Sequence, residues 1–393
     1  MMSGTTLTVT VSVLVGFSLA DDKAYAALPF TAQLVAGTLT TIPAAMLMSK
    51  IGRKLAFIVA TFFGITASIV CTYAIIQHDF WLFVSGCVFI GMFNGFAFYY
   101  RFTAADAVDK DYKSRAISYV LAGGVIAAFI GPNLAKLTRD MIDDATFAGS
   151  FAVMSVFYIL TFILLQFLKL PESANKQQRE HVSGRPLITI MRQPCFIVAV
   201  ICGMFGYGVM SLIMTATPLA MQHHNHLFSD TSFVIQWHVL GMFAPSFFTG
   251  HLIKRFGLMK ILFTGALAGV ACVIINHLGT SVEHFWLALF LLGISWNFLF
   301  IGATTMLTET YQPEERFKVQ ATNDFIVFST VAIASLSAGA LQHHYGWLMV
   351  NYSAIPALGL ILLSLIWLRF FTNKLDDFPD SQLIIKATTQ TES

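Results

Sequence analysis

Charged residues are scarce in this chain. They make up 11% of its 393 residues, whereas a soluble domain carries about 25%. Apolar residues make up 56%, and the mean hydropathy is +0.71. Apolar runs of about 20 residues, each long enough to cross the hydrocarbon of a bilayer, recur from one end of the chain to the other. The sequence therefore predicts an all-α membrane protein, and argues against a membrane β-barrel, whose strands alternate over about ten residues.

Motifs of catalysis and of nucleic-acid binding are missing as well. The sequence contains no P-loop, no HExxH motif and no basic block, and its net charge is +2. The cysteines show no CxxC spacing, which indicates core packing. They are Cys71, Cys87, Cys195, Cys202 and Cys272. We therefore expect no enzyme activity, no nucleic-acid partner and no prosthetic group.

Twelve apolar segments are long enough to be transmembrane helices. The largest polar interruption, residues 171–192, falls between the sixth and the seventh and has the composition of a solvated linker. We expect an N-terminal six-helix bundle over residues 1–169, a linker over 170–192, a C-terminal six-helix bundle over 193–375 and a tail over 376–393. The predicted segments are residues 5–20, 27–48, 54–76, 80–105, 115–138, 147–169, 193–222, 231–253, 258–278, 284–308, 319–342 and 347–370.

The distribution of Lys and Arg predicts the orientation. Of the 23 Lys and Arg residues, Lys23, Lys136 and Arg139 fall in loops on one side, and Arg101 falls inside a segment. The remaining 19 fall on the side that holds both termini and the linker. Because basic loops stay in the cytoplasm, we expect both termini and the linker to be cytoplasmic.

Two similar motifs follow the second and the eighth predicted helices. They are Pro43-Ala-Ala-Met-Leu-Met-Ser49-Lys50-Ile-Gly52-Arg53-Lys54 and Pro245-Ser-Phe-Phe-Thr-Gly250-His-Leu-Ile-Lys254-Arg255-Phe-Gly257. Twelve helices with this loop in both halves resemble the major facilitator superfamily, although Ala45 and Ser49 replace the glycine and the aspartate of the usual loop. The resemblance implies two bundles related by an axis along the membrane normal, with a substrate site between them near mid-depth.

Two pairs of soft metal ligands lie on the seventh and eighth predicted helices. Met210 and Met214 are four residues apart, as are His238 and Met242, so each pair shares one helix face. Both pairs lie at matched distances from the turn near His226. An antiparallel hairpin would therefore bring Met214 to His238 and Met210 to Met242. Thioethers and imidazole suit Cu(I), and a membrane-embedded histidine marks a functional site. The sequence predicts a copper site at these four residues; the alternative for the Met pair is ordinary packing.

A narrower resemblance follows from these pairs. MxxxM on the seventh helix with HxxxM on the eighth is similar to the CcoA-like copper importers of the same superfamily. That resemblance implies import of copper, as substrate, across the bacterial inner membrane for assembly of cbb3-type cytochrome oxidase. We expect the protein to be a monomer. The sister group of RfnT-type riboflavin transporters shares most of the scaffold. A carrier of riboflavin or another organic solute, or a proton-coupled drug exporter, is therefore the alternative.

Further residues are candidates for accessory metal binding. Cys202 lies two turns before Met210 and could receive an ion that moves inward. His223, His224 and His226 lie in the turn expected to face outward. They could capture metal at the outer mouth, or they could simply belong to a solvated polar loop.

Three charged residues are candidates for gating. Arg101 lies about one turn inside the expected cytoplasmic end of the fourth helix. Its side chain either reaches the interface, or forms a gate or an anion contact with Asp106 or Asp324 as partner.

Overall fold

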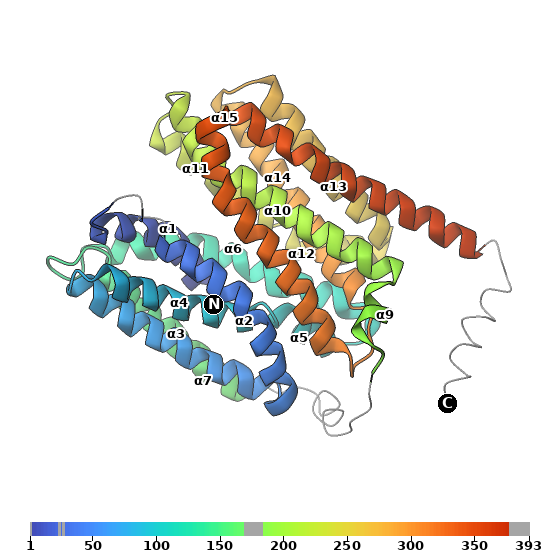
Figure 1. The fold of residues 1–393 in the computed structure, drawn as a ribbon, viewed down its shortest axis with the longest axis horizontal. Helices are drawn as coiled ribbons and strands as arrows, with labels where there is room; N and C mark the ends of the chain where they lie inside the picture. The colour runs from blue at the N-terminus through green and yellow to red at the C-terminus, as the bar shows by residue number, and fades with distance from the viewer. Residues whose placement is uncertain (1, 23–24, 26–27, 169–183, 377–393) are drawn as a thin grey trace.

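The helices account for all regular structure that the computed structural model describes, which is residues 2–22, 25, 28–168 and 184–376 (Figure 1). The last helix contains a kink at Gly346 and holds two spans, Arg316–Gln342 and His344–Phe370. The helices are α1 (Met2–Leu19), α2 (Leu28–Ile51), α3 (Arg53–Ile76), α4 (Phe80–Ala97), α5 (Tyr100–Asp106), η2 (Lys110–Tyr112), α6 (Lys113–Thr138), α7 (Ala148–Phe167), α9 (Leu187–Met191), α10 (Pro194–His223), α11 (Phe228–Phe243), α12 (Ser246–Phe256), α13 (Leu258–Leu278), α14 (Val282–Leu307) and α15 (Arg316–Asp376).

The predicted membrane fold is confirmed. Within the described residues, ten helices are long and apolar enough to cross a membrane. The other two predicted spans correspond to α1, with 18 residues, and to α11 and α12, which together form a broken helix. Residue 169 of the predicted N-terminal bundle, residues 170–183 of the predicted linker and residues 377–393 of the predicted tail lie outside the described residues. The exact bundle boundaries therefore stay a prediction.

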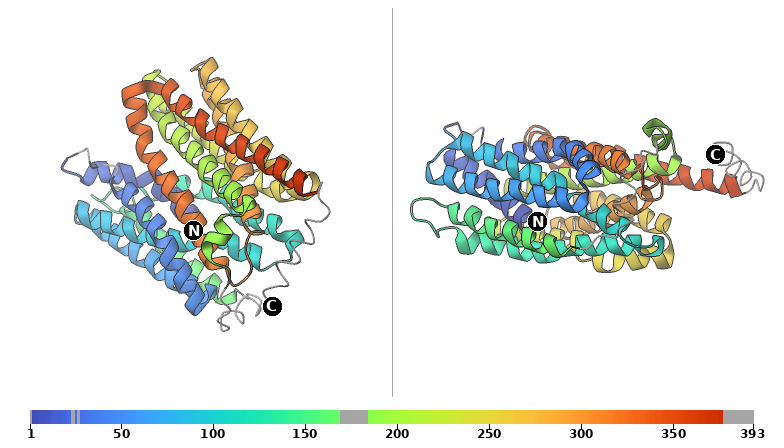
Figure 2. Two further views of the ribbon diagram at one scale, coloured as in Figure 1. Left: turned by 45° about the vertical axis from the view of Figure 1, so that its right-hand side comes forward. Right: turned by 90° about the horizontal axis from the view of Figure 1, so that it is seen from below.

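The helices form two groups, which we call the N-terminal half (α1–α7) and the C-terminal half (α10–α15). In the N-terminal half, α4 packs against α2 and α3, and α3 packs against α7. In the C-terminal half, α14 packs against α10, α11 and α13, and α10 packs against α15. Figure 2 shows the two groups side by side, with their ribbons spreading apart toward one end. The other end, where α9 lies, we call the linker end (Figure 1).

One expectation about neighbouring helices is wrong. The sequence predicts α10 and α11 to be an antiparallel pair because one turn connects them. In the structure α10 packs mainly on α15 and α14, whereas α11 packs mainly on α14 and α6. Proximity in the chain brings the ends of these two helices together but does not decide which faces pack.

The repeated loop motif has the same backbone conformation in both halves. Gly52 separates α2 from α3 with φ 87° and ψ 156°, and Gly257 separates α12 from α13 with φ 91° and ψ 148°. Side chains strongly disfavour this positive-φ region, which glycine adopts freely. The glycine of each motif is therefore required by the turn, and the two turns support the repeat inferred from the sequence.

The chain that enters the C-terminal half is tied to the start of α15. The buried Glu315 carboxylate accepts hydrogen bonds from the Arg185 backbone N–H (2.7 Å), from its side chain (2.9 and 2.7 Å) and from the Gln312 N–H (3.0 Å). Burial raises the pKa of Glu315. The hydrogen-bond donors outweigh burial and lower the pKa to about 2. The carboxylate is therefore ionised at neutral pH and fixes this segment at the linker end.

The broken helix α11–α12 is held by a buried amide. Pro245 separates the two segments and lacks the N–H that a continuous helix needs. Asn297 of α14 is fully buried and donates to the Met242 carbonyl (2.6 Å) and to the Ser246 hydroxyl (2.6 Å). Its own carbonyl oxygen accepts from the Thr249 hydroxyl (2.6 Å). One side chain thus satisfies the polar groups that the break exposes.

We predict that Asn297→Leu lowers the free energy of unfolding by roughly 1–3 kcal/mol, because it leaves buried donors and acceptors without partners. Thermal unfolding of the purified protein in detergent measures this loss. Asn133→Leu is the matched control, since Asn133 is exposed and bonds only the Phe129 carbonyl of its own helix. Equal midpoints for the two variants would contradict the role of Asn297.

Candidate functional site

A buried ion pair joins the two halves. Arg101 of α5 and Asp324 of α15 are 4% and 0% exposed, and an Arg101 Nη donates to an Asp324 carboxylate oxygen. The Asn323 amide donates to the same oxygen (2.9 Å), and Arg101 also donates to the Phe98 carbonyl (2.9 Å). The sequence left open whether Arg101 pairs with Asp106 or Asp324, or reaches the interface. The structure gives Asp324, and burial excludes a side chain extended into water.

A second polar cluster lies nearer to the linker end. Asp106 pairs with Arg53 of the loop motif (2.6 Å) rather than with Arg101. Arg53 also donates to the Thr103 hydroxyl (2.7 Å) and, across the two halves, to the Gln320 carbonyl oxygen (3.0 Å). Both clusters therefore join α15 to the N-terminal half at this end. Their predicted role in gating stays a prediction.

Aromatic rings surround the buried ion pair. Phe98, between α4 and α5, stacks on Phe328 of α15 with centroids 3.8 Å apart and planes at 16°. Tyr207 of α10 contacts the edges of Phe328 (5.8 Å), Trp296 (5.3 Å) and Phe300 (5.3 Å). We call these five residues the aromatic cluster. Phe98 and Tyr207 are half-buried and the other three are buried.

The guanidinium of Arg101 also lies against aromatic faces. Its central carbon is 4.7 Å from the ring centroid of Phe300 and 4.4 Å from that of Phe102. Such contacts stabilise a desolvated cation. The ion pair and the aromatic cluster therefore form one site between the halves, with stacking surfaces next to polar groups. This combination is typical of sites for organic ligands.

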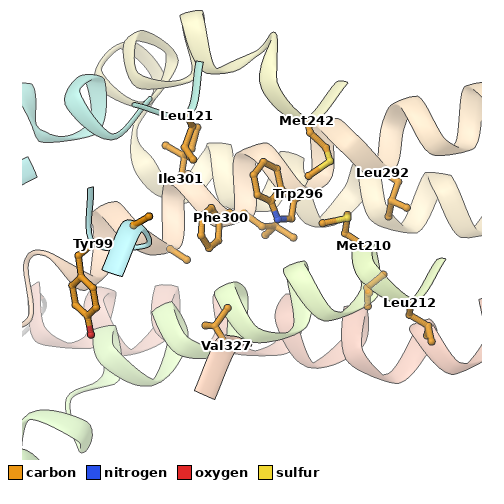
Figure 3. Packing of buried hydrophobic residues seen from close by; sticks show 14 of the residues in the cluster. Tyr99, Leu121, Met210, Leu212, Met242, Leu292, Trp296, Phe300, Ile301 and Val327 are labelled. Carbon is orange, nitrogen blue, oxygen red and sulfur yellow. The ribbon is translucent and has the colours of Figure 1, made fainter. Parts of the chain in front are cut away.

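The copper site predicted at Met210, Met214, His238 and Met242 stays a prediction. His238 is fully buried, and its Nδ1 is 2.7 Å from the Leu289 carbonyl of α14, the helix that packs on both α10 and α11. Its Nε2 has no hydrogen-bond partner. Met214 is half-buried in the core. The side chains of Met210 and Met242 extend toward one another beside the ring of Trp296 (Figure 3). Sulfur packing against an aromatic ring also explains this arrangement.

The accessory candidates are dispersed. Cys202 is buried and its thiol contacts Ser364 in the second span of α15. His223 and His224 are exposed with ring centroids 5.6 Å apart, while the His226 Nε2 is 2.7 Å from the Thr280 carbonyl. Within the part of the chain that the structure describes, no group of three His, Cys, Asp or Glu side chains could hold a metal ion. Their role in metal capture stays a prediction.

Sequence reasoning missed the aromatic cluster and the partner of Asp106. Aromatic residues make up 14% of the chain, and nothing in their spacing distinguishes Tyr207 or Phe328 from rings that face lipid. Arg53 was noted only as part of a loop motif. One signal could have indicated this pair. The loop motif supplies a basic residue, Arg53, and the fourth span ends in an acidic residue, Asp106.

The chain belongs to the major facilitator superfamily, whose family model matches residues 1–275 and 199–384. It is a multi-pass membrane transporter and not an enzyme. Among its relatives, the riboflavin transporter RfnT of Brucella anthropi is 44% identical over 353 residues, which cover 90% of this chain and 89% of the relative. The MFS-type transporter YdeG of Bacillus subtilis is 26% identical, covering 90% of this chain and 84% of the relative.

Solved structures share the fold. The outward conformation of the transporter FucP, whose Escherichia coli form is a fucose:proton symporter, aligns with a TM-score of 0.75 at 15% identity. That alignment covers 93% of this chain and 95% of FucP. A bacterial homologue of the iron transporter ferroportin aligns with a TM-score of 0.69 at 13% identity, with the same coverage. At these identities the likeness concerns the fold alone.

We predict that Arg101→Gln and Asp324→Asn each destabilise the protein by roughly 3–5 kcal/mol, because each leaves one buried charge without its partner. The double variant should regain much of the lost stability. Thermal unfolding of the four proteins gives the coupling energy of the pair. Strictly additive losses would mean that the two side chains do not interact.

Proposed function

We propose that this protein carries riboflavin across the bacterial inner membrane, with both termini and the linker in the cytoplasm. The observation that carries the proposal is the 44% identity to a riboflavin transporter over about nine tenths of both chains. Copper, the substrate favoured by the sequence analysis, finds no support among the relatives reported above. The proposed working unit is a monomer of two six-helix bundles, residues 1–169 and 193–375.

The chemistry of the site supports a flavin. Riboflavin consists of a flat three-ring system, with carbonyl and N–H groups along one edge, joined to a chain of hydroxyl groups. A flat ring stacks well against Tyr207 and Phe98, the two half-buried members of the aromatic cluster. Arg101 and Asp324 supply a donor and an acceptor next to those rings. We propose that these four residues contact the ring system.

The contacts between the halves support a transport cycle. The ion pair, the Phe98–Phe328 stack and the Arg53–Gln320 hydrogen bond join the halves toward the linker end. The ribbons spread apart at the opposite end (Figure 2). In the proposed orientation the solute enters from outside the cell. Its release then requires the Arg101–Asp324 and Phe98–Phe328 contacts to separate, so that the halves rock about the site.

We predict that Tyr207→Ala raises the riboflavin concentration for half-maximal uptake by roughly tenfold, which is the effect of losing about 1.4 kcal/mol of ring contact. Uptake of radiolabelled riboflavin by auxotrophic bacteria that lack their own transporter measures it. Tyr207→Phe should retain uptake because the ring remains. Tyr73→Ala, which removes an exposed ring of α3, is the control. Unchanged uptake by Tyr207→Ala would exclude the proposed stacking surface.

Copper import is a second candidate, favoured by one observation, the approach of the Met210 and Met242 side chains (Figure 3). If riboflavin is the substrate, expression of the protein leaves cell copper unchanged. Excess copper then also fails to compete with riboflavin uptake. We expect Met214→Leu and His238→Leu to change neither result. Metal analysis of the cells decides, and copper accumulation that is abolished by these two variants would establish the copper site instead.

A further inference from the structure

A cavity of about 690 Å³ lies at the linker end, apart from the aromatic cluster. Its wall is formed by the junction of α5, η2 and α6, between Asp106 and Tyr119. Tyr112 and Tyr119 are both half or more exposed, so the cavity opens to the surroundings of the protein. The transport cycle proposed above makes no use of it.

Arg115 is the cation of this cavity. Its Nε is buried without a hydrogen-bond partner, and its guanidinium lies 5.4 Å from the ring centroid of Tyr112. Within the described residues, no carboxylate forms an ion pair with it. A guanidinium carries five donors and prefers two-pronged contacts with carboxylate or phosphate oxygens. Its donors are thus available to a bound anion.

A second cation reaches the same ring from the other half. Lys254 of α12 also lies 5.4 Å from the centroid of Tyr112. Its Nζ is 3.3 Å from Asp111, whose side chain is 75% exposed, so water screens that attraction. Two positive charges from opposite halves therefore lie around one ring, and their mutual repulsion, which water also screens, opposes the closed linker end.

Two carboxylates, Asp106 and Asp109, also line the cavity, and within the described residues neither forms an ion pair with Arg115. Asp106 forms an ion pair with Arg53 at 2.6 Å, so its charge is neutralised within the Arg53 cluster described above. Asp109 is exposed, where solvent screens its charge. The two halves meet closely beside the cavity, since the Ser114 hydroxyl donates to the Gly250 carbonyl (3.3 Å) and a Cβ added at Gly250 would lie 2.7 Å from the Arg115 Cα. An anion bound here would therefore contact both halves at their interface.

We propose that this cavity binds a phosphate group, held by Arg115 and shared with Lys254 across the two halves. Bound phosphate cancels the repulsion between the two cations and bridges the halves, so it stabilises the arrangement that is closed at the linker end. The phosphate comes either from the headgroup of an anionic lipid or from a soluble phosphate monoester. Both present the same oxygens to the guanidinium fork.

Thermal unfolding and native mass spectrometry of the purified protein in lipid nanodiscs test the proposal. One arm compares phosphatidylcholine discs with discs that also contain phosphatidylglycerol. The other adds glycerol 3-phosphate to phosphatidylcholine discs. We expect one of the two to raise the unfolding midpoint by several degrees and to give a bound adduct. Arg115→Gln should weaken that binding by about tenfold, because a charge-assisted contact is lost.

Two further variants complete the test. Lys254→Gln should weaken binding as well, and it decides the outcome if Arg115→Gln does not fold. Lys260→Gln, which removes an exposed cation of α13 outside the cavity, should bind like the wild type. A response to phosphatidylglycerol alone identifies a lipid site, and a response to glycerol 3-phosphate alone identifies a soluble ligand. No response to either, or equal binding by the Arg115 and Lys260 variants, would overturn the proposal.

Discussion

The buried ion pair between Arg101 and Asp324 is the interaction on which the arrangement of the two halves depends. Each charge is almost completely removed from water, and a charge at that depth is costly unless it is paired. The two residues come from different halves, so the pair exists only while the halves are together. Separation of the halves must expose both charges to water or to a substrate. A role for the pair as a switch between two arrangements stays a proposal.

The aromatic cluster adds an apolar contact that also exists only while the two halves are together. The Phe98–Phe328 stack, like the ion pair, joins the two halves. Tyr207 of α10 contacts the Phe328 ring. A flat solute that inserts between such rings replaces contacts between the halves with contacts to itself. Helix α14 forms one side of the aromatic cluster through the stacked rings of Trp296 and Phe300. Asn297 of the same helix holds the break between α11 and α12 in place. The site is thus built on helices that are held in place by buried polar bonds.

The fold could be predicted from the sequence, because helix length in a bilayer is set by hydrophobic thickness and the turns are marked by glycine. The predicted segment 258–278 coincides with α13, and Gly52 and Gly257 mark equivalent turns. The site could be predicted only in part. Arg101 and Asp324 were named, but their pairing depends on how two halves of the chain meet, which local patterns do not encode.

The copper prediction also depends on which helix faces meet, and local patterns do not encode this. Equal spacing of Met214 and His238 from a turn describes two helices that face each other, but α10 packs mainly on α15 and α14, and α11 packs mainly on α14. The His238 Nδ1 is 2.7 Å from the Leu289 carbonyl, and its Nε2 has no hydrogen-bond partner. Which faces meet in a bundle is decided by side-chain packing around all neighbouring helices. The cluster around Tyr207 could not be found for that reason, since its members come from four separate stretches of the chain.

The most direct measurement is a titration of riboflavin with the purified protein, followed by the fluorescence of the flavin itself. Stacking against the aromatic cluster should quench that fluorescence in a saturable way in the wild type and much more weakly in Tyr207→Ala. Excess Cu(I) should leave the titration unchanged. An absence of saturable quenching, together with stoichiometric binding of Cu(I), would contradict a flavin site between the two halves.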